Sequence, residues 1–218
     1  MATVGASGFI RRCSRNGLIR NTEGFALVFF IILIPVIIMS WILISDMVQA
    51  VTSADFDIKD TLDFGIRTAN YQVDERSQAA GNARVNADRA HTEFRNLIVS
   101  DLKLDPVTLA PIANSPLAET PKYSLIVYNG DSDYSGCPSA RKYHFDGAIL
   151  TTTDLPGSGF PADFRLTEND ADLGGGGVAT VRLEHPGCVA WMKAKAKKAL
   201  GKDPIEATRW MASEIHYW

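Results

Sequence analysis

Four histidines are the side chains in this sequence best suited to catalysis or metal binding. They are His91, His144, His185 and His216. None lies three or four residues from another, the spacing that places two ligands on one face of a helix, and no HExxH pattern occurs. No CxxC pair and no cluster of cysteine with histidine occurs either. We therefore predict no metal site.

One loop comes closest to a cation site. Residues 129–136 (NGDSDYSG) place Asp131 and Asp133 two positions apart, where both carboxylates could supply hard oxygen ligands. The loop lacks the later Glu that completes an EF-hand loop, so a solvated turn is the favoured interpretation. Two acid pairs further along are also interpreted as loop charges: Glu168/Asp170 and Asp170/Asp172.

The glycine-rich stretches match no catalytic or nucleotide-binding motif. GSGF (residues 157–160) lacks the GxSxG spacing of a nucleophile elbow, and LGGGGVAT lacks the GxxxxGK[ST] pattern of a phosphate loop. The basic run KAKAKK is favoured as a solvated face, so nothing indicates a nucleic-acid surface. We predict that the protein is not an enzyme, uses no cofactor and binds no nucleic acid.

A long apolar block near the N-terminus dominates the rest of the sequence. Residues 25–44 are 20 residues with Ser40 as the one notably polar side chain. As a helix the block is about 30 Å long, which matches the hydrocarbon core of a bilayer. Pro35 lies inside it, which membrane helices tolerate with a local kink, and Trp41 lies near its far end, where indoles favour the headgroup zone.

Charge predicts the orientation of this membrane helix. The net charge is +3 before the block, where four arginines lie, and −6 after it. The positive-inside rule therefore puts the N-terminus in the cytoplasm and the residues after about 46 outside. A cleaved secretory signal is the alternative, but its apolar core is typically only about 7–15 residues long.

Two helices are expected beyond the block. From Asp46 to Val73 apolar residues recur at helical spacing, which predicts an amphipathic helix that continues the membrane helix. GNARVNADRAHTEFRNLIVSDLKLD predicts a second helix, capped by Asn86 or Asp88. Its expected buried stripe is Ala90, Phe94, Leu97, Ile98 and Leu102.

The C-terminal half has the pattern of a small sheet. YSLIVYN (123–129), KYHFDGAILTTT (142–153) and VATVRLEH (178–185) are strand candidates, and the proline-rich stretch 106–121 is a connection. CVAWMKAKAKKAL could form a basic helix, but it alternates, as does IEATRWMASEIHYW. We favour two strands joined near LGKD, and hence an α+β fold with a small, antiparallel, β-rich domain.

Three cysteines are present, and two of them lie in the part expected outside the membrane. Cys13 precedes the apolar block, whereas Cys137 and Cys188 follow it. A Cys137–Cys188 disulfide would close a loop of about 51 residues and stabilise the fold by up to about 4 kcal/mol. We favour this disulfide over two free thiols.

The opening block resembles a known family. Counted from Gly24, apolar residues follow at once, Pro35 lies eleven residues on, and Asp46 eleven after that. With RNTEG, FFIILIP and ISD around these positions, the block resembles the N-terminus of TadE/TadG-like pseudopilins of tight-adherence pilus systems, part of the wider type IV pilin-like group. The resemblance implies a processing junction between Gly24 and Phe25, and a stem whose packing involves Phe29, Pro35 and Asp46.

One position departs from the family pattern. The family has a Glu five residues after the processing Gly, where it meets a neighbour's free N-terminal amine, and here that position is Phe29. A lone charge in an apolar core is costly, so the pair needs both partners. Two interpretations follow: a minor or tip subunit that meets no neighbour's amine, or an uncleaved leader on a protein that stays in the membrane.

Four segments result from these patterns: a basic cytoplasmic leader (1–24), a transmembrane helix (25–45), a helical stem with a second helix (46–105), and an extracellular α+β domain (106–218). The favoured function is a pilin-like subunit or assembly component in the cell membrane, or in an extracellular filament. Its expected partners are membrane lipid and other pilin-like or pilus assembly proteins. The alternative is a single-pass membrane protein whose outer domain binds a ligand or partner and enters no filament.

Overall fold

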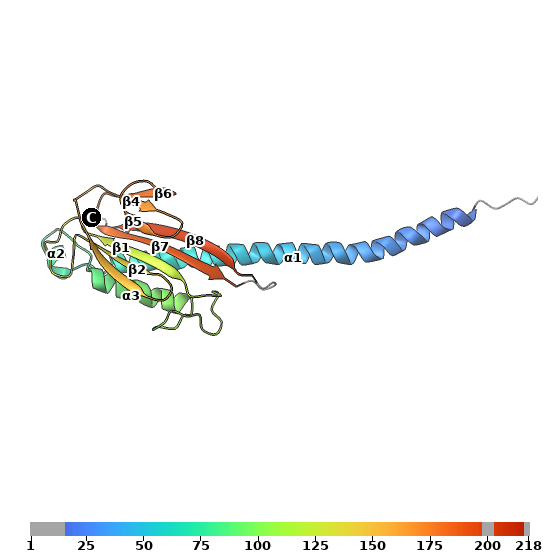
Figure 1. Cartoon of the computed structure of the whole chain (residues 1–218), viewed down its shortest axis with the longest axis horizontal. Helices are drawn as coiled ribbons and strands as arrows, with labels where there is room; N and C mark the ends of the chain where they lie inside the picture. The colour runs from blue at the N-terminus through green and yellow to red at the C-terminus, as the bar shows by residue number, and fades with distance from the viewer. Residues whose placement is uncertain (1–15, 198–202, 216–218) are drawn as a thin grey trace, which may run out of the picture. The chain divides into compact units, whose positions relative to one another are not determined.

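The computed structural model describes the backbone of residues 16–197 and 203–215, and the side chains of residues 27–48, 58–197 and 203–215. The chain divides into two units, Met1–Ser45 and Asp46–Trp218. The described part of the first unit is the N-terminal part of helix α1 (Asn16–Asn70), which contains Pro35 (Figure 1). The second unit holds all the other helices and strands described below.

Two shorter helices follow α1, and each begins at a capping side chain. The carboxylate of Asp74 accepts hydrogen bonds from the backbone amides of Arg76 and Ser77, at the start of α2 (Glu75–Ala79). Asn86 accepts from the amide of Arg89 at 3.1 Å, at the start of α3 (Ala87–Asp101). These caps satisfy amides that have no partner within the helix. The predicted second helix and its Asn86 cap are confirmed.

In the described part of the second unit, eight strands form two antiparallel sheets. The five-stranded sheet has the order β3-β2-β1-β7-β8, and the three-stranded sheet has the order β5-β4-β6. The strands are β1 (Lys122–Tyr128), β2 (Ala140–Phe145), β3 (Leu150–Leu155), β4 (Ala162–Leu166), β5 (Ala171–Leu173), β6 (Ala179–Leu183), β7 (Gly187–Ala196) and β8 (Ile205–Glu214). The second unit is therefore α+β with antiparallel sheets, as predicted.

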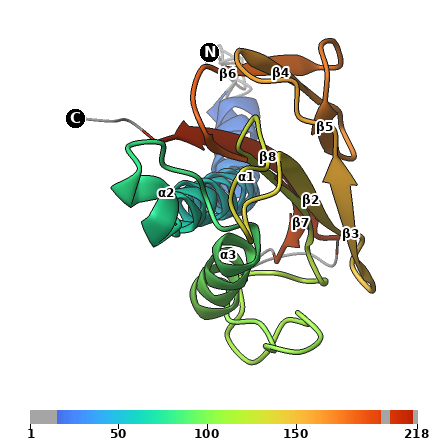
Figure 2. The same cartoon turned by 90° about the vertical axis from the view of Figure 1, so that its left-hand side faces the viewer.

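The five-stranded sheet is covered on both faces (Figure 2). The residues of α1 after Ile58 and helix α3 pack on one face, in a core that includes Leu62, Phe94 and Leu125. The three-stranded sheet packs on the other face, in a core that includes Tyr128 and Trp191. Because β1 and β7 lie inside the sheet, side chains on both of their faces are buried, which explains the apolar runs LIVY in β1 and CVAWM in β7.

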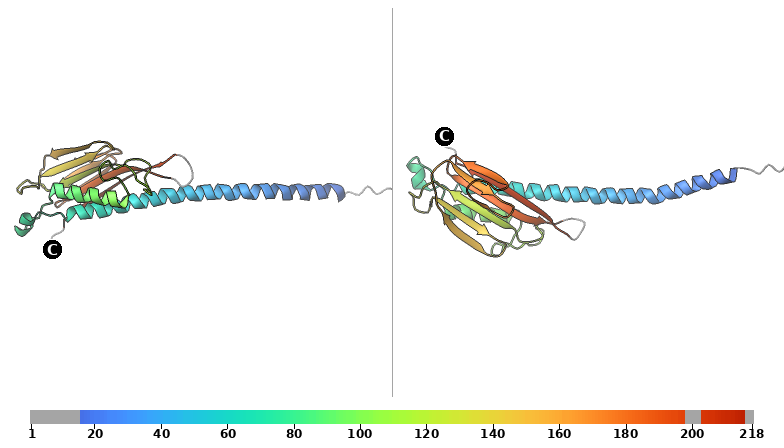
Figure 3. Two further views of the ribbon diagram at one scale, coloured as in Figure 1. Left: turned by 90° about the horizontal axis from the view of Figure 1, so that it is seen from below. Right: turned by 45° about the horizontal axis from the view of Figure 1, so that its top comes forward.

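Helices α1 and α3 lie side by side under the sheet (Figure 3). A Cβ atom added to Gly65 of α1 would lie 2.9 Å from Cδ2 of Phe94 in α3. The close approach of the two helices therefore requires the smallest residue at this position. This contact belongs to the second unit, where residues on either side of position 105 share one core. The structure thus joins in one compact unit the two segments, 46–105 and 106–218, that the sequence pattern separated.

The strand predictions agree with the structure in part. Strand β1 and the C-terminal pair β7 and β8 are confirmed, and the last two pair in antiparallel register. The candidate at 142–153 is in fact two strands, β2 and β3, separated by a turn in which Asp146 accepts hydrogen bonds from two backbone amides. Strands β4 and β5 were not predicted, because they are only five and three residues long.

Candidate functional sites

The segment Leu27–Val48 of α1 is apolar and exposed. It is 22 residues long, its most apolar stretch of 18 residues has a mean hydropathy of 3.1, and no residue of that stretch is buried. At about 1.5 Å per residue it is roughly 33 Å long, enough to cross a bilayer. Within the described part of the chain this is the one segment long and apolar enough to span a membrane. So large an apolar surface requires lipid or another apolar surface to cover it.

The predicted stem residues lie on or next to this segment. Phe29 is 53% exposed, Pro35 lies inside the helix, and Asp46 is half-buried. The hydroxyl of Ser40 donates to the backbone carbonyl of Val36 at 2.8 Å, so even the most polar side chain of the apolar block is satisfied within the helix. The predicted processing junction, Gly24 and Phe25, lies outside the residues whose side chains are described.

The predicted disulfide is wrong, because Cys137 and Cys188 are both free and buried. Cys137 lies in a tight turn, where its backbone forms an isolated antiparallel β-bridge with Tyr134. Its sulfur is 4.0 Å from the backbone carbonyl of Arg84. Cys188 lies in β7 and packs in the core beneath the helices. The entropy gained by closing a loop depends on its length and not on where the two side chains point.

Burial makes both thiols poor nucleophiles. It raises the pKa of Cys137 to about 11, and it raises the pKa of the fully buried Cys188 further above its usual range. We expect neither thiol to react with iodoacetamide at pH 8 in the native protein, and both to react after unfolding without reductant. Intact mass and peptide mapping measure this, with glutathione as the reagent control. A linked Cys137–Cys188 peptide would contradict the structure.

The loop considered for a cation is occupied by an ion pair. Nε of Arg84 donates to one carboxylate oxygen of Asp131 at 2.9 Å, and Nη2 of the same guanidinium pairs with the other oxygen. The hydrogen bond from Arg84 lowers the pKa of Asp131. Among the described residues no group of three or more His, Cys, Asp or Glu side chains is placed to hold a metal ion. The interpretation of residues 129–136 as a turn is therefore the better one.

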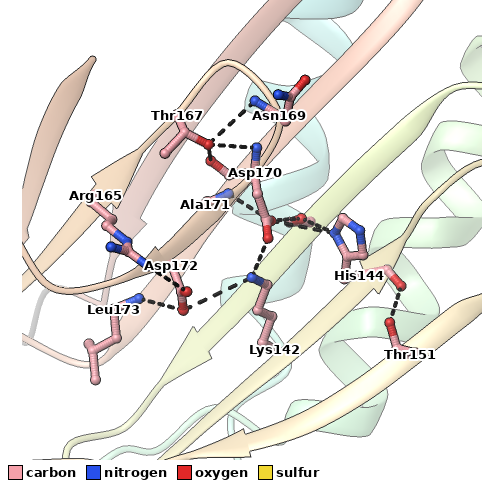
Figure 4. Close-up of polar contacts among 11 residues, drawn as sticks. Lys142, His144, Thr151, Arg165, Thr167, Asn169, Asp170, Ala171, Asp172 and Leu173 are labelled. Atoms are coloured by element: carbon pink, nitrogen blue, oxygen red, sulfur yellow. Dashed lines mark hydrogen bonds and ion pairs between the residues drawn. The ribbon is translucent and has the colours of Figure 1, made fainter. Parts of the chain in front are cut away.

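A polar cluster joins the two sheets (Figure 4). Asp170, which precedes β5, accepts hydrogen bonds at 2.6 Å from both Lys142 of β2 and Ser124 of β1. Nδ1 of His144 lies 2.8 Å from the Ser124 hydroxyl and 3.4 Å from the same carboxylate. Burial acts to raise the pKa of Asp170, but the hydrogen bonds from Lys142 and Ser124 outweigh it and hold the pKa below its usual value.

Ser124, His144 and Asp170 have the residue types of a hydrolase triad but not its geometry. In a triad the histidine lies between the other two, with one ring nitrogen facing the serine and the other facing the acid. Here the same Nδ1 faces both Ser124 and Asp170, and the serine hydroxyl donates directly to the carboxylate. The serine is also fully buried. The cluster therefore serves as a joint that holds β5 against β1 and β2.

This joint was missed in the sequence. The carboxylate of Asp170 was interpreted as a loop charge, but it is paired and partly buried. Two sequence features indicate such a joint. Ser124 is a polar residue in an apolar stretch, and Lys142 and His144 occupy alternate positions of the next strand. Their alternation puts both side chains on one face, and a buried polar face needs an acid opposite it.

A second buried network connects α3 to the opposite face of the sheet. The ring of His91 stacks on Tyr143 with centroids 4.1 Å apart, and its Nε2 lies 2.9 Å from the Tyr123 hydroxyl. The Tyr143 hydroxyl donates to Asp88 at 2.7 Å, and Arg141 pairs with the same carboxylate oxygen. Burial lowers the pKa of His91 to about 4, so the ring is neutral at pH 7. This histidine belongs to the core and not to a ligand site.

No family model, curated protein or solved structure matched this chain. Its two distinctive features are the exposed apolar segment of α1 and the two-sheet arrangement of the second unit.

Proposed function

We propose that this chain is a pilin-like structural or assembly subunit of a tight-adherence-type surface pilus or secretion system. Before processing, the apolar segment holds the chain in the cell membrane with its basic leader in the cytoplasm, and the second unit lies outside. Its partners are membrane lipid and other pilin-like subunits or assembly proteins. It is not an enzyme, and it binds no nucleic acid.

The exposed apolar segment Leu27–Val48 is the observation that carries this proposal. None of its apolar side chains is buried, and most of them are more than half exposed, so its environment must be lipid or the apolar helices of other subunits. A pilin-type stem uses both environments, lipid before assembly and neighbouring helices after it. The spacing of Gly24, Pro35 and Asp46 along the same stretch supports a stem over a generic anchor.

The second unit fits the role of the outer domain. Its helices and antiparallel sheets form the compact α+β unit that the sequence pattern predicts for the outer domain. Its most triad-like cluster lacks the geometry for nucleophilic catalysis, which supports a structural role over an enzymatic one. The four arginines before the apolar segment support an outer location for this unit.

Phe29 favours the second candidate, a single-pass membrane protein that enters no filament. A processed neighbour's amine would find no carboxylate at this position. Cell fractionation separates the two functions: we expect a C-terminally tagged chain in filaments sheared from the cell surface, with a mature N-terminus at Phe25. Strict retention in membranes together with an N-terminus at Met1 would favour the second candidate and contradict the first.

Anchoring is tested with a matched pair of arginine variants. Ile37 lies at the middle of the apolar segment and is 55% exposed, whereas Ile149 lies in the second unit and is 65% exposed. Ile37→Arg should oppose membrane insertion by about 3 kcal/mol, because a charge at the centre of a bilayer is costly. We expect Ile37→Arg to deplete the membrane fraction and Ile149→Arg to leave it unchanged. Equal membrane fractions for the two variants would contradict the anchoring role.

A further inference from the structure

A slot of 210 Å³ lies between the two sheets, on the side where β8 and β6 form their edges. Its floor and walls come from the end of β4, the start of β6 and the facing strands β7 and β8. Ligand pockets for drug-sized molecules are typically about 300–1,000 Å³. The volume of this slot therefore suits a single ring-sized group.

Two tryptophans line the slot. Trp191 of β7 and Trp210 of β8 are direct partners in the antiparallel register, so their side chains lie on the same face of the sheet. Trp191 is fully buried, whereas Trp210 is 44% exposed. The slot thus has an aromatic side that runs from its buried end to its opening. Val178, which is 76% exposed, adds an apolar group at the opening.

The buried indole has an unsatisfied donor. Nε1 of Trp191 has no hydrogen-bond partner among the residues that the structure describes. Buried tryptophan N–H groups usually find an acceptor, and an exception in a native protein calls for a reason. The Nε1 atom itself has almost no accessible surface, so a ligand oxygen reaches it only when the slot opens further around Trp191.

Two further polar side chains of the slot are available to a ligand. The carboxylate of Glu168 and the hydroxyl of Thr208 line it, and neither makes a hydrogen bond or ion pair with a described residue. Thr167 also lines the slot, but its hydroxyl is already engaged within its own turn, where it donates to the carbonyl of Asp170 and accepts from the amide of that residue (Figure 4). The free groups are therefore one buried donor, one acceptor and one hydroxyl.

We propose that this slot binds one pyranose ring of a carbohydrate. A pyranose has a flat C–H face, which stacks on the negative face of an indole such as Trp210. Its hydroxyls both donate and accept, so one ring can accept from the N–H of Trp191 and donate to Glu168. A purely apolar group would leave the Trp191 donor unsatisfied, and an anionic group would be repelled by Glu168.

The test is a titration of the full chain in alkylphosphocholine micelles, whose headgroups contain no sugar. The readout is the indole N–H signal of Trp191 by NMR, assigned with Trp191→Phe, during addition of glucose, galactose, mannose and N-acetylglucosamine. We expect at least one of these sugars to shift the signal with saturation, at a Kd on the order of 1 mM, as befits one small ring. Trp210→Ala should weaken binding at least tenfold, and Glu168→Gln several-fold.

Controls separate a sugar site from other outcomes. Trp41→Phe changes a tryptophan that does not line the slot and should bind as the unmodified chain does. Thr208→Val is a second slot variant, should Trp210→Ala fail to fold, and it should also weaken binding. The proposal is overturned if no sugar shifts the Trp191 signal, if cyclohexanol shifts it as strongly as the sugars do, or if a proline-rich peptide binds there and the sugars do not. Because the readout lies in the second unit, these outcomes do not depend on filament formation.

Discussion

Asn129→Leu should lower the free energy of unfolding by roughly 4 kcal/mol, because it leaves several buried backbone groups without partners. Asn129 is fully buried. Its Oδ1 accepts from the amide of Val85 at 2.8 Å, and its Nδ2 donates to the carbonyls of Val85 and Pro138 at 2.9 and 3.0 Å. This side chain, directly after β1, thus holds the backbone next to the cap of α3 at Val85 and the backbone just before β2 at Pro138.

Asn70→Leu is the matched control. Asn70 is also buried, at 8% exposed, but neither its side-chain nitrogen nor its oxygen has a hydrogen-bond partner among the described residues. Replacing an unsatisfied polar group by an apolar one is neutral or stabilising, so we expect a change within about 1 kcal/mol of zero, or a gain. Urea unfolding followed by tryptophan fluorescence measures both variants. Equal losses for the two would show that the Asn129 hydrogen bonds contribute nothing specific.

Acidification should destabilise the second unit through His91. Its pKa is about 4 in the folded chain against an ordinary value of 6.5, because burial disfavours the charged ring, the nearby Arg95 adds to this effect, and Asp88 opposes it only in part. The unfolded chain therefore binds more protons than the folded chain between these two pH values. Stability should fall as the pH drops through this window, by about 3 kcal/mol in total, and this contribution should level off below pH 4.

His91→Gln isolates this effect. The variant lacks the titrating ring, so the difference in unfolding free energy between it and the unmodified chain should shrink steadily from pH 7 to pH 4. Carboxylates with lowered pKa values, such as Asp131 and Asp154, also lose stabilising charge on acidification, but they do so in both proteins and cancel in the difference. A difference that is independent of pH would mean that the folded chain protonates His91 as readily as the unfolded one.

The features best predicted from the sequence are those set by local rules. The start of α3 followed from a capping side chain, Asn86, next to a helical apolar stripe. The stripe itself was nearly right: Ala90, Phe94, Ile98 and Leu102 are buried, whereas Leu97 is only half-buried. Strands β7 and β8 followed from their alternation, which outweighed the basic, helix-like composition of KAKAKK.

Features that depend on distant segments were not predictable in the same way. The role of Asp170 depends on Lys142 and Ser124, which lie 28 and 46 residues away in the chain. The short strand β5 exists because β4 pairs with it and not because its own residues favour a strand. The cysteines are a further example. Both follow the apolar block in the sequence, but the sequence does not show that the fold places them at different sites, where they cannot pair. The pairing of Trp191 with Trp210 likewise depends on the register of β7 against β8, which the sequence alone does not give.

The position of β7 in the sheet determines when the second unit can fold during synthesis. Strand β1 is complete at Tyr128, but one of its two neighbours is β7, which begins at Gly187. Both cores contain β7 side chains, so neither core can close while the chain ends before this strand. In a nascent chain that lacks its last strands, β1 therefore has an unpaired edge and exposed apolar faces. Such an edge can pair with the wrong strand of the same chain or of another chain. We infer that this unit folds only after its synthesis is almost finished, and that shortened products of the chain are targets for degradation rather than partly working proteins.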